Sequence, residues 1–235
     1  MSAPLSVIIP TLNAEAALRA LLPGLVDGLA TGLLREVIVS DGGSTDGTLA
    51  LAGAAGAIVV TGPPGRGGQI GRGATAARGS WLLVLHADTC LPEGWAREVS
   101  AAMARPERAH VFRLSFRASG LAPRLVAGWA NLRTRLFGLP YGDQGLLIAR
   151  PLLESMGGYP DLPLMEDVAL ARALARRPAL LPLYVSTDAA RYEADGWLRR
   201  GGRNLWLLVR YFAGVRPERL ARGYSAASGA PSSSN

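Results

Sequence analysis

The 235-residue sequence contains no lysine, since all 25 of its basic residues are arginine. This absence excludes mechanisms that need a lysine Schiff base, and it excludes phosphate-binding loops that depend on a lysine. Cysteine is almost absent too, with Cys90 as its single representative. An intrachain disulfide and a zinc site built from several thiolates are therefore excluded. A chain with one free thiol is consistent with the reducing cytoplasm, where we expect this protein.

Long hydrophobic runs are also missing. No stretch reaches the roughly 18 to 20 continuous apolar residues that span a bilayer, and the best late candidate, 205–215, is interrupted by Arg210. The first residues lack the basic start of a signal peptide, and the apolar run 5–10 has the length of a strand. We therefore expect no transmembrane segment.

The positive charge is unevenly distributed. The formal net charge is +7, and residues 191–222 hold eight arginines against three acidic residues, a net charge of +5. Such a segment suits an anionic partner: a diphosphate, an acidic membrane surface or a nucleic acid. Because no nucleic-acid motif accompanies the charge, a basic nucleic-acid-binding module is a less favoured alternative. Peripheral membrane contact through this basic C-terminal helix stays open.

Hydrophobic residues make up 49% of the chain, enough for a sizeable core. In the first part, short apolar runs alternate with alanine- and leucine-rich segments. The pattern predicts strands over 6–9, 36–39, 57–60 and 81–85, and helices over 15–29, 46–55 and 71–77. Continuous apolar strands separated by helices are typical of an α/β fold with a mostly parallel central sheet and helices on both faces.

The later part has a mixed pattern. It predicts strands over 110–116, 145–149 and 179–186, and helices over 94–104, 123–137, 151–156, 166–177 and 204–213. Residues 224–235 are rich in serine, alanine and glycine, which predicts a disordered tail. We therefore expect one domain over 1–223, followed by this tail.

Polar residues follow several predicted strands directly. Asn13 follows the first strand and Asp41 ends the second. Ligands of open α/β sheets bind beyond the carboxyl ends of the strands. Asn13 and Asp46 can equally be helix caps. A carboxylate such as Asp41 at the lip of a parallel sheet needs a partner, which a ribose or base would supply.

The order and spacing of these motifs resemble family-two glycosyltransferases with the GT-A fold. Residues 39–48 resemble their nucleotide-binding signature, 7–13 their first strand and loop, and 165–167 their Glu-Asp catalytic motif. His86-Ala87-Asp88 stands where they carry Asp-x-Asp. The likeness covers about 6–177. Segments such as 142–145 further resemble a bacterial subgroup linked to arsenosugar biosynthesis.

The resemblance implies a Rossmann-like GT-A fold and transfer of a sugar from a nucleoside-diphosphate sugar, with UDP favoured, to an acceptor hydroxyl with inversion. Residues to about 90 would form a nucleotide-binding half, 91–190 an acceptor and catalytic half, and 191–223 a basic C-terminal helix. Asp167 would be the general base, with Glu166 as the adjacent alternative. The acceptor would be a small molecule or a lipid-linked one.

Asp88 is the predicted ligand of a divalent cation, Mg²⁺ or Mn²⁺, that bridges the departing diphosphate. His86 replaces the first carboxylate of the family motif, although its imidazole can still bond a ribose or phosphate. Strict metal dependence is therefore open. A catalytically decayed nucleotide-sugar-binding protein is the main alternative, and a simple hydrogen-bonded histidine at a strand end is the alternative for His86.

The remaining candidate residues divide between two sides of the expected site. On the donor-nucleotide side we expect Pro10, Thr11, Asn13, Asp41, Arg66, Gln69 and His86. On the acceptor or sugar side we expect Asp143, Gln144 and Trp197. Residues 62–73 are interpreted as a flexible loop that runs into the helix predicted from Gly71, with Arg66 or Arg72 near the phosphates. Arg191, Arg199 and Arg203 are interpreted as a basic cover for the diphosphate.

A dinucleotide-dependent oxidoreductase is the remaining rival. Residues 71–76 match a Gly-x-Gly-x-x-Ala pattern, but in that fold the glycines directly follow their strand. Here Gly71 lies well beyond the preceding strand, which is predicted to end near Thr61. The spacing argues against this rival.

Overall fold

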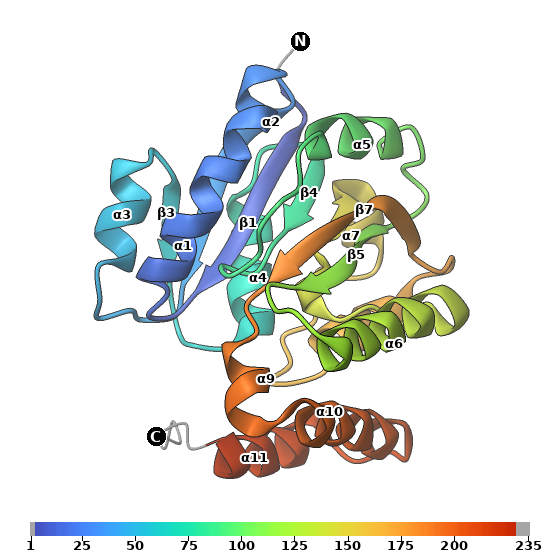
Figure 1. Ribbon diagram of the computed structural model, residues 1–235. Helices are drawn as coiled ribbons and strands as arrows, with labels where there is room; N and C mark the ends of the chain where they lie inside the picture. The colour runs from blue at the N-terminus through green and yellow to red at the C-terminus, as the bar shows by residue number, and fades with distance from the viewer. Residues whose placement is uncertain (1–2, 229–235) are drawn as a thin grey trace.

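A computed structural model describes residues 3–228, and one seven-stranded sheet lies at its centre. The strands are β1 (Leu5–Thr11), β2 (Leu34–Asp41), β3 (Ile58–Thr61), β4 (Trp81–Val84), β5 (His110–Phe116), β6 (Leu146–Ala149) and β7 (Ala179–Thr187). Their order across the sheet is β3-β2-β1-β4-β6-β5-β7 (Figure 1). Only β6 runs antiparallel to its neighbours. The predicted mostly parallel α/β sheet is confirmed.

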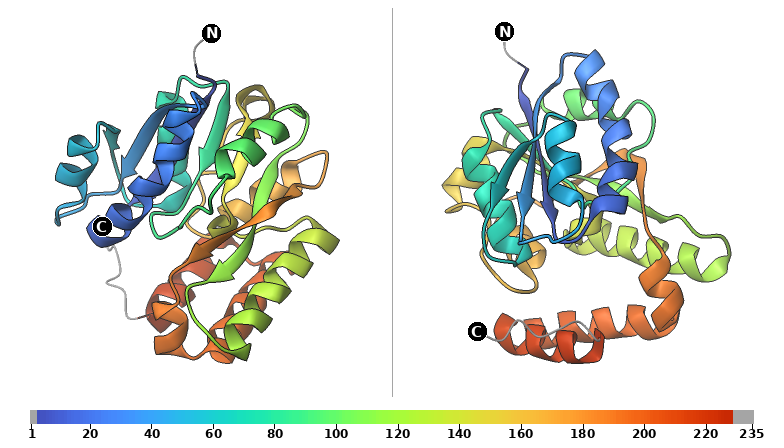
Figure 2. Two further views of the ribbon diagram at one scale, coloured as in Figure 1. Left: turned by 45° about the horizontal axis from the view of Figure 1, so that its top comes forward. Right: turned by 90° about the vertical axis from the view of Figure 1, so that its left-hand side faces the viewer.

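Helices cover both faces of this sheet (Figures 1 and 2). The first group along the chain is α1 (Glu15–Leu21), η1 (Leu22–Leu25), α2 (Val26–Ala30), α3 (Thr48–Ala54), α4 (Arg66–Ala76) and α5 (Trp95–Ala102). The second is α6 (Leu121–Phe137), η2 (Gly142–Gln144), α7 (Arg150–Ser155), α8 (Glu166–Ala173), α9 (Ala190–Asp195), α10 (Trp197–Phe212) and α11 (Pro217–Ser228).

The central strands are apolar throughout because both of their faces are buried. In β1, Val7 and Ile9 belong to a core with Leu18 of α1 and Trp95 of α5. Ile8 points the other way, into a second core formed with α4, α7 and α8. Successive side chains of a strand alternate between its faces, so one short apolar strand contributes side chains to both cores. Each strand end is thereby fixed between two helix layers.

Helix α4 begins at Arg66, five residues earlier than the sequence predicted. The interpretation of 62–73 as a flexible loop is therefore wrong from Arg66 onward. The glycines there serve close packing: a Cβ on Gly67 would lie 2.3 Å from the carbonyl oxygen of Pro160. Such a contact is distant in sequence, so local composition cannot reveal it.

The C-terminal part is more helical than predicted. Helix α10 begins at Trp197 and not at Asn204, and the segment expected to form one basic helix over 191–223 forms three helices, α9, α10 and α11. Because α11 continues to Ser228, the predicted disorder is wrong for 224–228, while 229–235 lie outside the described residues. Within the described chain, every helix is too short or too polar to cross a membrane.

Several chain segments that carry polar and charged residues meet at one edge of the sheet. Six of the strands run parallel, so their carboxyl ends point the same way, and antiparallel β6 begins at this edge, where Leu146 pairs with Val84. The segments after β4 and β7 and before β6 therefore meet there. The two halves inferred from the sequence share this one sheet, joined where β4 pairs with β6.

Candidate active site

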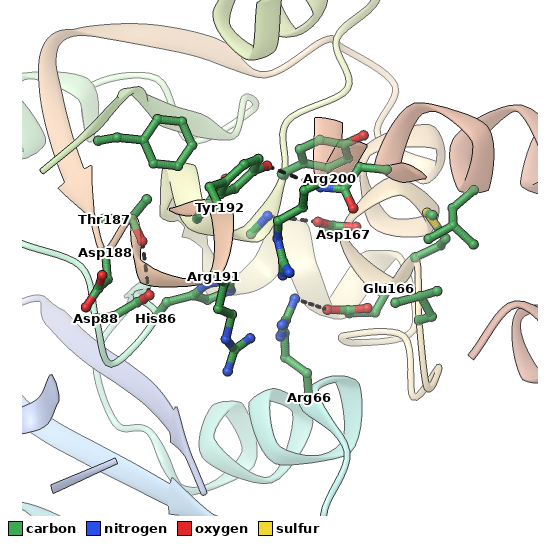
Figure 3. A pocket seen from close by; sticks show the side chains of 18 residues that line it. Arg66, His86, Asp88, Glu166, Asp167, Thr187, Asp188, Arg191, Tyr192 and Arg200 are labelled. Atoms are coloured by element: carbon green, nitrogen blue, oxygen red, sulfur yellow. Dashed lines mark hydrogen bonds and ion pairs between the residues drawn. The ribbon is translucent and has the colours of Figure 1, made fainter. Parts of the chain in front are cut away.

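A cavity of about 190 Å³ lies at this edge. Its walls come from the start of α4, the segments after β4 and β7, η2, the start of α8, and the inner sides of α9 and α10 (Figure 3). Its polar and charged lining residues include Arg66, His86, Asp88, Asp143, Glu166, Asp167, Thr187, Asp188, Arg191, Tyr192 and Arg200. Segments far apart in sequence thus build one site.

Asp88 lies in the segment after β4, and hydrogen bonds join this segment to the end of β7. Thr187 Oγ1 donates a hydrogen bond to Asp88 Oδ2 at 3.1 Å. Cys90 and Ser186 exchange two backbone hydrogen bonds, of 2.7 and 3.1 Å. Arg117 Nη1 donates to the carbonyl oxygen of Asp88 at 3.0 Å and to Cys90 Sγ at 2.9 Å. The Asp88 carboxylate is therefore held at the cavity by the second half of the chain.

The carboxylate of Asp88 fits one ligand of a hard divalent cation but not a complete metal centre. Among the described residues, no group of three or more histidine, cysteine, aspartate or glutamate side chains is placed to hold a metal. Mg²⁺ and similar ions are commonly bound by one or two carboxylates while substrate phosphates and water supply the other oxygens. The donor set present suits that second arrangement.

His86 contributes a neutral imidazole to the cavity. Burial, reinforced by the charges of Arg66 and Arg191, holds its pKa well below the usual 6.5. Its Nε2 atom is buried, with no hydrogen-bond partner among the described residues. The alternative of a hydrogen-bonded histidine at the end of the strand has no support at Nε2 and otherwise stays untested. Gly142 lets the ring approach, because a Cβ there would lie 2.6 Å from Nε2.

The start of α8 brings two adjacent carboxyl groups to the cavity. Met165, buried at the N-terminus of α8, has the left-handed φ of 65° that non-glycine residues seldom adopt. Such backbone strain concentrates at functional sites. Asp167 Oδ2 accepts a hydrogen bond of 2.8 Å from the Gly142 amide, and Oδ1 accepts one of 2.7 Å from the Val168 amide. These bonds fix the orientation of its carboxylate.

Glu166 has a different environment. Its side chain is only 3% exposed, and Oε1 lies 3.3 Å from Arg66 Nη1. Burial, followed by the charge of Asp167, raises the pKa of Glu166 to about 7 against the opposing effect of Arg66. Glu166 therefore exchanges its proton near neutral pH.

Asp143, from η2, is a third acidic group in the cavity. Burial raises its pKa to about 6, and the charges of Asp167 and Asp88 add to this while Arg133 opposes it. Its buried Oδ1 has no hydrogen-bond partner among the described residues. The structure thus places this predicted acceptor-side residue inside the cavity.

Trp197 does not line the cavity but packs behind residues that do. Its ring stacks on Tyr192, with centroids 4.9 Å apart, and Phe116 meets both rings edge-on. Phe116 and Tyr192 lie on the cavity wall. The prediction that Trp197 contacts a ligand is therefore corrected: its ring supports this wall.

Two predicted binding glutamines have structural roles. Gln69 Nε2 donates to the carbonyl oxygens of Thr11 and Ser40, at 2.7 and 2.9 Å. Gln144 is fully buried, and it accepts from Thr134 Oγ1 and donates to the Phe112 carbonyl. Their amides are used inside the fold, so neither faces the cavity.

The expectation that Asp41 needs an external partner is also wrong. The residue is fully buried, and its carboxylate accepts hydrogen bonds from the Thr11 and Ser44 hydroxyls and the Gly43 and Ser44 amides. Burial acts to raise its pKa, but the bonds from Ser44, Thr11 and Gly43 outweigh it and leave the pKa below 3.8. Asp41 organises its own loop.

Asn13 and Asp46 tie neighbouring loops together. Asn13 Oδ1 accepts from the amide of Thr45 at 2.8 Å, and no side chain caps α1 at Ala14, so the capping interpretation of Asn13 is wrong. Asp46 accepts from the amides of Glu15 and Thr48, the first residues of α1 and α3, but it is not the N-cap of α3, which is Gly47 without a side-chain cap bond.

Of the predicted donor-side residues, only Arg66 and His86 line the cavity; Pro10, Thr11, Asn13, Asp41 and Gln69 lie outside it. Of the three arginines proposed to cover the diphosphate, Arg191 lines the cavity and Arg199 does not. Arg203 pairs with Asp195. Arg72 bonds the Pro63 carbonyl.

Sequence reasoning missed Thr187, Asp188, Tyr192 and Arg200 as cavity residues. Thr187 is the last residue of β7, and Asp188 follows it directly. The rule that predicted polar residues after the earlier strands would have identified both of them, had it been applied to this strand.

Comparison with known proteins gives a family match. The model of "Glycosyl transferase family 2" matches residues 6–136. A curated relative, glucosyl-3-phosphoglycerate synthase of Mycobacterium tuberculosis, is 34% identical over 97 residues. That match covers 37% of this chain and 30% of the relative, so it spans less than a third of the relative's length.

Solved structures share the fold. S. aureus TarS in complex with UDP-GlcNAc matches with a TM-score of 0.58 and 18% identity, covering 79% of this chain and 58% of TarS. The M. tuberculosis glucosyl-3-phosphoglycerate synthase in complex with Mn²⁺, UDP and glucosyl-3-phosphoglycerate matches with a TM-score of 0.53 and 25% identity, covering 79% and 71%. The predicted GT-A fold is confirmed.

Proposed function

The chain belongs to glycosyl transferase family 2, and we propose that it moves a sugar from a nucleoside-diphosphate sugar, with UDP as the nucleotide, to an acceptor hydroxyl with inversion at the anomeric carbon. One observation carries this proposal. Asp88 lies on one side of a single cavity, and Glu166 and Asp167 lie on the other (Figure 3). The space between can receive a donor diphosphate beside Asp88 and an acceptor beside Asp167. The structural relatives that bind UDP or a UDP-sugar support the choice of nucleotide.

Asp167 is the proposed general base. A single-displacement transfer needs one group that takes the proton of the acceptor hydroxyl as its oxygen attacks. The amides of Gly142 and Val168 hold the Asp167 carboxylate in place, and each oxygen keeps a free lone pair. Glu166, paired with Arg66 and half protonated near neutral pH, is less suited to this role.

Asp88 is the proposed protein ligand of Mg²⁺ or Mn²⁺. When bound, such an ion neutralises charge on the departing diphosphate. Arg66 and Arg191 bring further positive charge to the same cavity. Because His86 is neutral and supplies no second carboxylate, we propose that metal strengthens donor binding without being its only source.

The sugar and acceptor side is assigned to Asp143 and to the wall of Phe116 and Tyr192. Sugar rings pack on aromatic faces, and their hydroxyl groups bond carboxylates. We also place the chain, acting in the cytoplasm as one domain over 1–223, in the bacterial subgroup linked to arsenosugar biosynthesis. Some of the residues that carry this resemblance, among them His86, Asp143 and Glu166, line the cavity.

Thermal denaturation in the presence of UDP or GDP, each with and without Mn²⁺ or Mg²⁺, tests the proposal. We expect UDP to raise the Tm and the metal to raise it further. Asp88→Ala should lose the metal-dependent part only, and Glu154→Ala, an exposed carboxylate far from the cavity, should behave as wild type. If no nucleoside diphosphate stabilises the protein, the donor site is refuted.

A further inference from the structure

Exposed apolar side chains are concentrated on two helices. Of the sixteen strongly exposed large hydrophobic residues in the described chain, eleven lie on α6 and α10. On α6 they recur every three or four residues, which places them on one face of the helix. These residues are Leu121, Leu125, Trp129, Leu132 and Leu136, and Phe137 at the end of the helix is exposed as well.

Helix α10 repeats the arrangement. Leu198, Leu205, Trp206, Val209 and Phe212 are exposed, with Leu198 80% and Trp206 61% accessible. The opposite side of α10 is buried. It contributes Arg200, Asn204 and Leu207 to the wall of the cavity. One helix therefore has an inner face at the site and an outer apolar face.

The two outer faces lie on neighbouring helices. Helix α10 packs along α6, and a Cβ on Gly201 would lie 3.9 Å from the Val126 side chain. Figures 1 and 2 show the helices side by side at the end of the molecule occupied by α9–α11. Each helix buries its other side in the protein body, so each exposed stripe faces away from that body. We call the two stripes together the α6–α10 face.

The charge at this face is mainly positive. Neither α6 nor α10 contains an acidic residue. Arg124, Arg135 and Arg199 are exposed on these helices, and around the start of α11 Arg216, Arg219 and Arg222 are exposed together with one acidic residue, Glu218. Amphipathic helices with arginine beside leucine and tryptophan lie in the interface of anionic bilayers, where tryptophan is favoured at the headgroup level.

We propose that the α6–α10 face docks the protein on an anionic lipid surface. Charge complementarity selects this occupant, since arginine adds attraction to anionic headgroups to the burial of apolar area. A second copy would instead bring arginines against arginines. Membrane contact was expected through the basic C-terminal helix, whereas six of the eleven exposed hydrophobic residues belong to α6.

Docking would place the cavity next to the bilayer. The inner face of α10 lines the cavity, so about one helix diameter, roughly 10 Å, separates the cavity wall from the lipid. An acceptor carried by a membrane lipid would then have a short path to Asp167. This last step rests on the proposed function, whereas docking itself does not.

Vesicle flotation of the full-length protein tests docking without any substrate. We expect binding to vesicles of phosphatidylcholine mixed with phosphatidylglycerol, weaker binding to phosphatidylcholine alone, and release by salt. The double variant Trp129→Glu/Trp206→Glu should need at least about tenfold more lipid for half-maximal binding. The matched control Val26→Glu/Leu29→Glu, which alters two exposed apolar residues of α2, should bind as wild type.

Failure to bind anionic vesicles would overturn docking, and so would equal loss of binding in both double variants. A concentration-dependent dimer in sedimentation velocity that only Trp129→Glu/Trp206→Glu dissolves would show that a second copy covers the face. UDP-induced stabilisation is measured separately from vesicle binding. Failure of docking therefore does not refute the proposed transferase function, and absence of UDP binding does not refute docking. Unchanged circular dichroism of the variants confirms that they fold.

Discussion

Arg66 and Glu166, the first residues of α4 and α8, form an ion pair of 3.3 Å across the mouth of the cavity, although 100 residues separate them in sequence. The arginine is half exposed and the glutamate is buried. A donor phosphate entering the cavity would compete for the same guanidinium. The pair therefore links the charge of Glu166 to occupancy of the donor side.

Glu166→Gln should flatten the dependence of stability on pH. Burial and Asp167 raise the pKa of Glu166 in the folded protein to about 7, whereas its ordinary value is 4.5. The stabilisation that comes from tighter proton binding is complete below about pH 4.5 and is lost as the pH rises to about 7. Calorimetry measures the Tm at each pH. Between about pH 5 and pH 8 the Tm of the wild type should decrease by a few degrees more than the Tm of the variant does.

Glu107→Gln is the matched control, since Glu107 also pairs with an arginine but is exposed. It should follow wild type at every pH. A Glu166→Gln curve parallel to wild type would show that Glu166 is already ionised in the folded protein.

Asp167→Asn should abolish turnover while preserving the donor site. Loss of a positioned general base typically lowers the rate by about 10² to 10⁴-fold. The amide keeps the shape of the side chain and one acceptor oxygen for the Gly142 amide, so UDP should still bind. Calorimetric titration of UDP and the rate of UDP release from a UDP-sugar separate the two effects. Retained turnover would move the base to Glu166 or elsewhere.

Gln69→Met should destabilise the fold without a specific effect on nucleotide binding. The substitution leaves the buried carbonyl oxygens of Thr11 and Ser40 without their donor. Loss of such bonds costs about 2 to 4 kcal/mol in total. Urea denaturation measures the loss. Normal stability with weakened UDP affinity would restore Gln69 to the donor site.

Asp41→Asn should be harmful at neutral pH and nearly harmless in acid. The folded pKa of Asp41 lies below its ordinary 3.8, so its stabilising contribution is present above about pH 4 and is lost as the pH falls through the folded value. An asparagine amide would also face the Gly43 and Ser44 amides, donor against donor. Urea midpoints should therefore differ widely near pH 7 and converge as the pH falls below about 4.

The sequence was informative wherever structure depends on local pattern. Val7, Ile8 and Ile9 predict a strand buried on both faces, and the parallel-sheet rule then places Asp88 at the ligand-binding edge. Asp167 could be assigned only through its resemblance to a family motif. Both residues lie in the cavity.

The direction in which a side chain points, and contacts between residues far apart in sequence, could not be predicted in this way. Gln69 and Gln144 follow the same polar pattern as true cavity residues, yet their amides turn inward to carbonyl groups far away in sequence. Gly67 looked like part of a flexible loop because its packing partner, Pro160, lies more than ninety positions later. Tyr192 and Arg200 reach the cavity only through the docking of α9 and α10.

The attachment of the Asp88 segment to β7 limits how this protein can be divided. A fragment ending near residue 90 would contain the whole donor-side signature. It would lack β6, which pairs with β4, and the Thr187 hydroxyl and Ser186 backbone that position Asp88 and Cys90. The signature is thus not a transferable module: grafted onto another scaffold without its late strands, it would bring the Asp88 carboxylate without the residues that orient it.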